Sequence, residues 1–183
     1  MNAKKLILVS LFAALTAVGA FIKIPIPILP FTMQFFFCAM AGILLGSKAG
    51  ALSQLIYVCI GLAGFPIFTG GGGFTYIYKP TFGFLMGLIF AAFVIGLIIE
   101  KAKNPSYFTY ILAIFAGLFA LYLIGIPYLY FILKLYLNKP KSIGFIMSAY
   151  VIPFLGGDIL KSVLVTFLCV RLKKVNFIRK INV

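Results

Sequence analysis

Apolar runs of membrane-spanning length follow one another along nearly the whole chain. An α-helix needs about 20 such residues to cross the hydrocarbon core of a bilayer. Over all 183 residues the mean hydropathy is +1.20, and only 10% of the residues are charged. An ordinary soluble domain carries more than twice that share of charged residues. The sequence therefore predicts a polytopic α-helical membrane protein.

The chain has room for about six such helices and little else. We therefore expect an all-α fold with six transmembrane helices, forming a single integral-membrane domain over residues 1–183. The expected helices span residues 6–22, 32–45, 50–63, 81–99, 108–124 and 148–170. The second and third are short for a full span. No internal repeat is visible, so the sequence gives no support to an inverted-repeat transporter.

The formal charge is +14, from 16 lysines and arginines against two acidic residues, and histidine is absent. In a soluble protein this excess would suggest nucleic acid, but here the basic residues lie mainly in short loops and at the ends. That pattern orients helices in a membrane. Ten basic residues against five favour both termini in the cytoplasm, and we expect no nucleic-acid partner. The first 20 residues also fit a cleaved signal peptide, but the chain beyond them continues as further apolar spans.

This orientation gathers three unusual loops on the outer side. Residues 23–30 hold three prolines, which prevent a continuous helix. Residues 64–80 include the four-glycine run Gly70–Gly73, which is either a flexible surface loop or a lid over a ligand site. Residues 125–141 mix tyrosines, lysines and apolar residues, a composition typical of a membrane interface. The sequence predicts an external cavity capped by these loops.

Asp158 and Lys161 lie within an otherwise apolar run, residues 148–170. A charged group at membrane depth costs about 2.5–3.5 kcal/mol on insertion scales, so it indicates a functional site. A spacing of three residues places both side chains on one face of a helix. Three interpretations remain open: a self-neutralising structural pair, a clamp for a polar ligand, and a proton relay resting on one buried carboxylate.

Other polar positions have a functional and a plain interpretation. Lys79 precedes Pro80 at the start of the fourth helix, where it is either a counter-charge for an anion or an interfacial lysine reaching water. Gln34, early in the second helix, either faces a ligand or bonds another helix. Glu100, at a cytoplasmic helix end, is interpreted as solvated.

Ala13 and Ala17 form a small-xxx-small pattern that lets another helix approach closely, although such pairs also arise by chance in alanine-rich spans. The three cysteines are well separated in the sequence and form neither a disulfide framework nor a metal motif. We therefore expect no metal site, no cofactor and no catalytic residue.

Taken together, the motifs of this chain resemble those of the BioY family, the biotin-specific S components of energy-coupling factor (ECF) vitamin transporters. Their order and spacing carry the resemblance, which runs through most of the chain. The matching segments are Ala13–Ala17, residues 27–34, 45–51 and 57–68, the glycine run, residues 79–84 and residues 153–161.

The resemblance implies a protein that binds biotin from the outside. In the family, the Asp and Lys of the last motif contact the ureido ring, which assigns that role to Asp158 and Lys161. A basic residue before Pro-Thr pairs with the valerate carboxylate, a role that falls on Lys79. The chain departs from the family at Phe82 and Phe84, where the family often has glycine and tyrosine, so one polar contact is missing. Further ligand-binding candidates are Gln34 and the wall residues Phe68, Phe74, Tyr76 and Phe84.

The resemblance also implies a membrane subunit of the bacterial cytoplasmic membrane that is not an enzyme. It would work with an ECF transmembrane coupling subunit, docked on Ala13 and Ala17, and with two ATP-binding subunits, since the chain has no nucleotide-binding motif. An S component for another vitamin is the alternative. A membrane-embedded enzyme acting on lipid lacks its usual acid–base pair here, and a solitary channel or structural protein is a further possibility.

Overall fold

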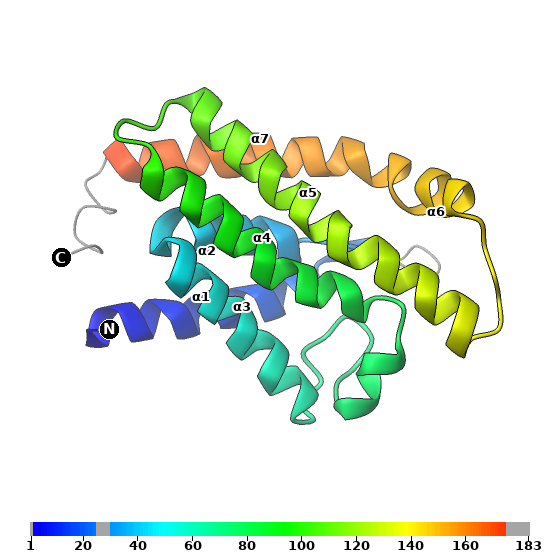
Figure 1. Ribbon diagram of the computed structural model, residues 1–183. Helices are drawn as coiled ribbons and strands as arrows, with labels where there is room; N and C mark the ends of the chain where they lie inside the picture. The colour runs from blue at the N-terminus through cyan, green and yellow to red at the C-terminus, as the bar shows by residue number, and fades with distance from the viewer. Residues whose placement is uncertain (1, 25–29, 175–183) are drawn as a thin grey trace.

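The computed structural model describes residues 2–24 and 30–174, with the side chains of Lys173 and Lys174 left out. Its helices run roughly alongside one another in an elongated bundle (Figure 1). The first helix begins and the last helix ends at the same end of this bundle. The helices are α1 (Ala3–Phe21), α2 (Gln34–Leu45), α3 (Ser47–Leu62), α4 (Phe82–Lys101), α5 (Tyr107–Phe131), α6 (Ile143–Tyr150) and α7 (Ile152–Lys174). A 3-10 helix η1 (Phe74–Tyr78), a π-helical turn η2 (Ile132–Tyr136) and two short strands, β1 (Lys23–Ile24) and β2 (Phe31–Thr32), complete the described elements.

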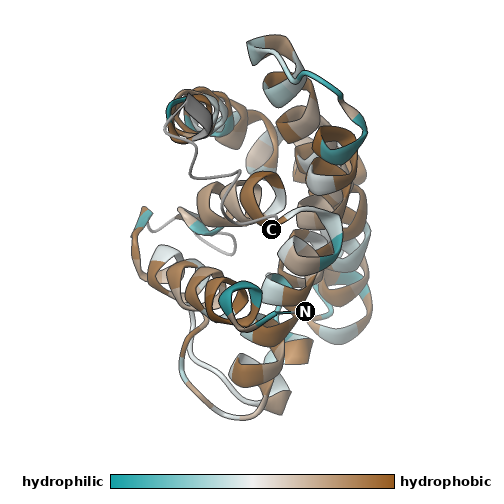
Figure 2. Cartoon of the chain, turned by 90° about the vertical axis from the view of Figure 1, so that its left-hand side faces the viewer, coloured by the Kyte–Doolittle hydropathy of each residue, from teal (hydrophilic) through white to brown (hydrophobic). Residues whose placement is uncertain are grey.

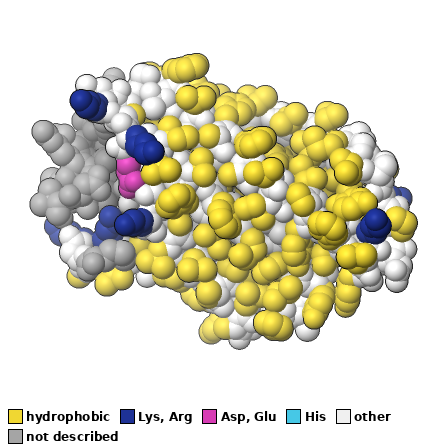
Figure 3. Space-filling view, in the orientation of Figure 1, with side chains coloured by type: hydrophobic (Ala, Val, Ile, Leu, Met, Phe, Trp, Pro, Cys, Tyr) yellow, Lys and Arg dark blue, Asp and Glu magenta, His cyan; other side chains and the backbone are white. Residues whose placement is uncertain are grey.

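Within residues 2–24 and 30–174, four helices are long and apolar enough to cross a membrane: α1, α4, α5 together with η2, and α7 as far as Leu172. The expected second and third spans are also apolar helices, but α2 has 12 residues and α3 has 16. Viewed along the bundle, the ribbons are mainly hydrophobic (Figure 2). On the face shown in Figure 3, hydrophobic side chains cover the middle and the basic side chains gather at the two ends. This distribution suits a multi-pass membrane protein.

The expected outer loop at residues 125–141 is wrong over most of its length. Helix α5 continues to Phe131, and η2 extends the helical path to Tyr136. Pro127 lies inside α5; a proline there removes one N–H donor, and apolar side chains that pack on α4 and α7 offset this loss. The interface-like composition of the segment was therefore compatible with helix.

The expected last helix, residues 148–170, is divided between α6 and α7. Helix α6 begins at Ile143 and ends at Tyr150, and Val151 separates it from α7. Pro153 lies in the first turn of α7, where its missing N–H costs no intrahelical bond. The same proline cannot continue α6, which explains the break.

Helix α4 is central in the bundle, because it packs against α2, α3 and α5. At its C-terminal end it touches the tight turn between α2 and α3, where Gly46 has φ +84°. A side chain at Gly96 would meet the backbone of Gly46 and Ser47, so only glycine fits. One turn later, the Glu100 carboxylate accepts hydrogen bonds from the Ser47 N–H (2.9 Å) and hydroxyl (2.6 Å). Glu100 is exposed, and it also caps the N-terminus of α3. The amino-acid sequence did not indicate this second role.

The β1–β2 strand pair and the loop that contains Gly70–Gly73, here called the glycine loop, lie at the opposite end. Strands β1 and β2 pair antiparallel, with Lys23 opposite Thr32, and the prolines between them at residues 25 and 27 are outside the described residues. The loop with the glycine run is closed by paired backbone hydrogen bonds between Phe68 and Gly71 (2.9 and 3.1 Å). Gly71 and Gly73 have φ of +115° and +95°, which favour glycine.

Candidate functional site

A cavity lies next to β2 and the glycine loop, with walls supplied by α2, α4, α5 and α7. Its lining is mainly apolar, with a few polar groups, as expected of a small-molecule site. The lining residues are Pro30, Phe31, Thr32, Gln34, Phe35, Thr69, Tyr76, Thr81, Phe84, Leu85, Leu88, Leu118, Leu121, Tyr122, Phe154, Asp158 and Lys161.

Asp158 and Lys161 lie one turn apart on α7 and both face this cavity. The Lys161 Nζ is 2.6 Å from Asp158 Oδ1, and the two residues are only 3% and 5% exposed. Each charge offsets the cost of burying the other. The buried pair presents a carboxylate and an ammonium to anything that enters the cavity.

A third polar group joins the pair from a different helix. The Tyr122 hydroxyl on α5 donates a hydrogen bond of 2.7 Å to Asp158 Oδ2. Sequence reasoning missed Tyr122, because it is one of ten tyrosines and lies in a plain apolar helix. The one available signal is general: a buried tyrosine hydroxyl usually has a hydrogen-bond partner.

Lys161 also ties α7 to β2. Its Nζ donates to the Thr32 carbonyl oxygen at 3.3 Å and lies 4.0 Å from the centre of the Phe31 ring. The Phe31 ring in turn contacts the Phe154 ring, with centroids 5.6 Å apart. The ammonium is thus held by a carboxylate, a carbonyl and an aromatic face, all of which favour a positive charge.

Gln34 lines the cavity and connects β2 with the glycine loop. Its Oε1 accepts hydrogen bonds from the hydroxyls of Thr32 (2.8 Å) and Thr69 (3.3 Å), and its Nε2 donates to the Tyr57 hydroxyl (2.9 Å). Tyr57 donates onward to the Ile67 carbonyl (3.2 Å). Gln34, which is predicted to contact the ligand, therefore also holds β2 and the glycine loop together. One N–H of its amide group remains for a ligand.

Phe84 and Tyr76, two of the expected wall residues, also line the cavity. Phe84 meets the Tyr122 ring edge to face, with centroids 6.2 Å apart. Tyr76 is 3% exposed, and its hydroxyl accepts a hydrogen bond from the Thr81 hydroxyl (3.2 Å). These two aromatic rings add apolar surface to different parts of the wall.

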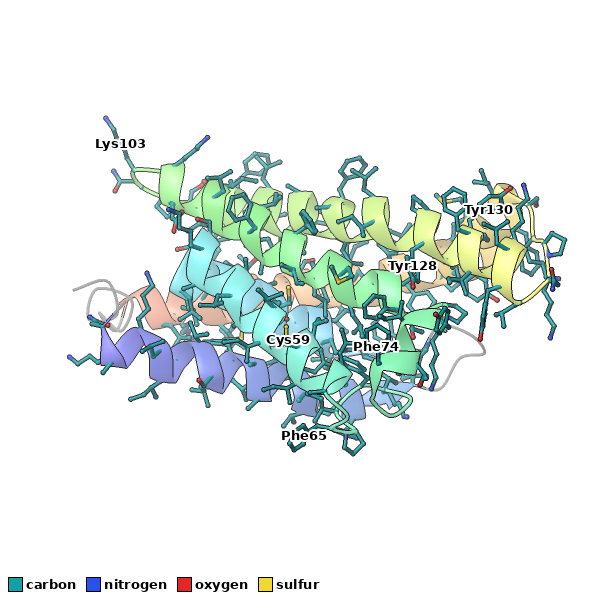
Figure 4. All side chains as sticks on the ribbon, turned by 60° about the horizontal axis from the view of Figure 1, so that its bottom comes forward. Cys59, Phe65, Phe74, Lys103, Tyr128 and Tyr130 are labelled. Carbon is teal, nitrogen blue, oxygen red and sulfur yellow. The ribbon has the colours of Figure 1, made fainter. Side chains whose placement is uncertain are left out.

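Three predicted site residues lie outside the lining. Phe68 is 1% exposed and packs behind Tyr76, with ring centroids 4.6 Å apart, so it supports the wall rather than forming it. Phe74, labelled in Figure 4, is 70% exposed. Lys79 is exposed, and its Nζ donates to the Gly70 carbonyl at 2.6 Å and lies 4.7 Å from the centre of the Tyr76 ring. It therefore contacts Tyr76, a lining residue, without lining the cavity itself.

The two predicted docking alanines differ in exposure. Ala13 is 5% exposed and belongs to the core where α1 packs against α2 and α3, whereas Ala17 is half-buried. In the middle of α1, Ser10 and Ala14 are small residues that are exposed. The spacing of Ala13 and Ala17 did not identify which face of α1 is covered by the chain itself.

The arrangement suits a neutral polar group that has both N–H donors and a carbonyl acceptor. The carboxylate accepts the donors, the ammonium donates to the acceptor, and the apolar walls hold the rest of the ligand. Among residues 2–24 and 30–174, no group of three or more His, Cys, Asp or Glu side chains is placed to hold a metal ion.

The BioY family model matches residues 1–177 of this chain. A probable biotin transporter BioY of Lysinibacillus sphaericus is 44% identical over 170 residues, which cover 93% of this chain and 87% of the relative. The biotin transporter BioY of Thermotoga maritima is 38% identical over 175 residues, which cover 93% of this chain and 96% of the relative. Among solved structures, the S-component for biotin from an ECF-type ABC transporter superposes with a TM-score of 0.71 at 27% identity and covers 95% of each chain.

Proposed function

This chain belongs to the BioY family, and from that premise we propose that it is the substrate-binding membrane subunit that captures biotin outside the cell for uptake. It is an S component of an ECF-type transporter and not an enzyme. Both termini lie in the cytoplasm, and the cavity opens on the outer side next to β2 and the glycine loop. The outward position follows from the distribution of basic residues.

The observation that carries this proposal is the buried Asp158–Lys161 pair in an apolar cavity. The ureido ring of biotin offers N–H donors to the carboxylate and a carbonyl oxygen to the ammonium. Hydrogen bonds to charged groups are about twice as strong as those between neutral groups. The fused rings and the aliphatic tail then pack against leucine and phenylalanine side chains such as Leu85, Leu118 and Phe84.

The function is tested on purified, detergent-extracted protein. Small molecules that copurify are identified by mass spectrometry, and biotin is titrated into ligand-free protein by calorimetry. We expect biotin to copurify and to bind with one-to-one stoichiometry. Copurification of thiamin or riboflavin, together with no heat from biotin, would instead identify an S component for another vitamin.

Lys79 is proposed to pair with the carboxylate of the biotin tail. Its ammonium is exposed beside Tyr76, and its present partner is a backbone carbonyl rather than a carboxylate. A carboxylate that leaves the cavity past Tyr76 is a stronger partner for that ammonium. Because the ammonium is exposed, the gain in affinity is modest.

We expect Lys79→Ala to weaken binding of biotin about five-fold and to leave binding of biotin amide almost unchanged. Calorimetric titration of both ligands measures the two effects. Lys134→Ala is the matched control, because this lysine also lies over an aromatic ring, Tyr130, at 5.6 Å but outside the cavity lining. Equal losses for the acid and the amide would refute the assignment of Lys79 to the carboxylate.

Uptake is proposed to require a transmembrane coupling subunit and two ATP-binding subunits, because the chain carries no nucleotide-binding motif. The coupling subunit is proposed to dock on the open face of α1, which includes Ala14 and the half-exposed Ala17. Small side chains there let a partner helix approach closely within the membrane. Buried Ala13 instead contributes to the packing of α1 inside this chain.

Neighbouring substitutions separate docking from folding. We expect Ala14→Trp to lower biotin uptake by cells about ten-fold or more while leaving biotin affinity unchanged, because an indole holds the partner helix away. Ala13→Trp should reduce the yield of folded protein, since the ring would have to enter the core. Normal uptake by a folded Ala14→Trp variant would exclude this face as the docking surface.

A further inference from the structure

Both carboxylate oxygens of Asp158 are engaged before any ligand enters the cavity. Oδ1 is 2.6 Å from the Lys161 ammonium, on the same helix, and Oδ2 accepts the Tyr122 hydroxyl at 2.7 Å from α5. The carboxylate plane is therefore held from two sides by groups on two different helices. Rotation of the Asp158 side chain would break at least one of these bonds.

Tyr122 has a single hydroxyl proton, and it is donated to Asp158. A carboxylate accepts about four hydrogen bonds, so two acceptor sites remain after Lys161 and Tyr122 are satisfied. Their directions are set by the bonds already in place. Holding a binding group in its bound orientation removes part of the entropic cost of association.

We propose that Tyr122 is a positioning residue, whose hydroxyl orients the Asp158 carboxylate so that its free acceptor sites meet the N–H groups of the ligand head. This inference rests on the proposed function and deepens it, because it adds a requirement for the geometry of the head group. Lys161 is restrained separately, by the Thr32 carbonyl and the Phe31 ring. Tyr122 therefore acts on the acceptor half of the clamp.

The packing role of Tyr122 is separable from its hydroxyl. Its ring lies edge to face with Phe84, with centroids 6.2 Å apart, and the apolar part of that contact remains in a phenylalanine. Tyr122→Phe therefore removes the bond to Asp158 and retains the wall of the cavity. The matched control is Tyr110→Phe, the same change on the same helix at a 1% exposed tyrosine outside the cavity lining.

We expect Tyr122→Phe to bind biotin about ten-fold more weakly than the wild type, the scale of one hydrogen bond to a charged group. Tyr110→Phe should bind as the wild type does. Circular dichroism and size-exclusion chromatography of the ligand-free variants check that both remain folded. Wild-type affinity in a folded Tyr122→Phe variant would overturn the inference, whereas absence of biotin binding by the wild type would instead overturn the proposed function.

A direct contact between the Tyr122 hydroxyl and the ligand would produce a similar loss, so a second measurement separates the two roles. We expect the wild type to bind the two ureido N-methyl derivatives of biotin more weakly than biotin and unequally, because each methyl group blocks a different donor. If the hydroxyl orients Asp158, the preference for one N-methyl derivative over the other narrows in Tyr122→Phe, since the carboxylate can then turn towards the remaining N–H. An unchanged preference between the two derivatives, with all affinities lowered together, would overturn the positioning role.

Discussion

An Asp158→Asn variant is expected to bind biotin about 100-fold more weakly than the wild type. Breaking one partner of a buried, hydrogen-bonded charge pair costs about 2–5 kcal/mol, and each 1.4 kcal/mol is a factor of ten in affinity. The amide has nearly the shape of the carboxylate but accepts only at its oxygen. Calorimetric titration of the purified variant measures the loss.

Two controls separate this loss from a loss of folding. Asp158→Asn leaves the Lys161 ammonium buried without its counter-charge, so the double variant with Lys161→Met removes both charges and should fold but not bind biotin. Glu100→Gln makes the same chemical change at the only other acidic residue of the chain, at the end of α4 beside the α2–α3 turn. It should leave biotin affinity unchanged. Comparable losses in Glu100→Gln and Asp158→Asn would contradict the assignment of the clamp.

The second large effect concerns stability. Gly96→Ala is expected to lower the free energy of unfolding by about 2–3 kcal/mol. The added methyl group would meet the backbone of Ser47 and Gly46, which cannot withdraw without opening the turn between α2 and α3. Thermal unfolding of the detergent-solubilised protein, followed by circular dichroism, measures the change.

The same substitution at another helical glycine should have the opposite sign. Gly156 lies in α7, where an added methyl group would have no atom of the described residues within 4 Å beyond its own helix turn. There, Gly156→Ala should raise the stability by about 0.5–1 kcal/mol, because alanine has the higher helix propensity. A Gly96→Ala variant that is more stable than the wild type would contradict this prediction. It would show that the turn between α2 and α3 can move away from α4 at little cost in free energy.

The sequence was most informative where a short segment carries residues that are costly to bury. The burial cost of Asp158 and Lys161 is visible in the sequence, because two charges interrupt an apolar helix, and their spacing already places them on one face. Tyr122 joins them from 36 residues away. Such a contact depends on how α5 rotates against α7, which no pattern within α5 records.

Composition was a poorer guide to the loops and to exposed faces. Lysines, tyrosines and a proline suggested a loop after residue 124, but packing on neighbouring helices keeps the segment helical. The spacing of Ala13 and Ala17 indicates a smooth helix face, whereas the approach of α2 and α3 decides which alanines stay exposed. Likewise, the exposed position of Phe74 and the buried one of Phe68 follow from the path of the glycine loop.

The unequal helix lengths have a consequence for the surrounding lipids. Residues 107–136 form a continuous helical path of 30 residues, about 45 Å long, whereas the 16 residues of α3 reach only about 24 Å. In Figure 4, Tyr130 near the end of α5 accordingly lies far beyond Phe65 at the end of α3. A hydrocarbon layer about 30 Å thick cannot match both lengths. We therefore expect α5 to tilt in the membrane and the lipid layer to be thinner beside α3 than beside α5.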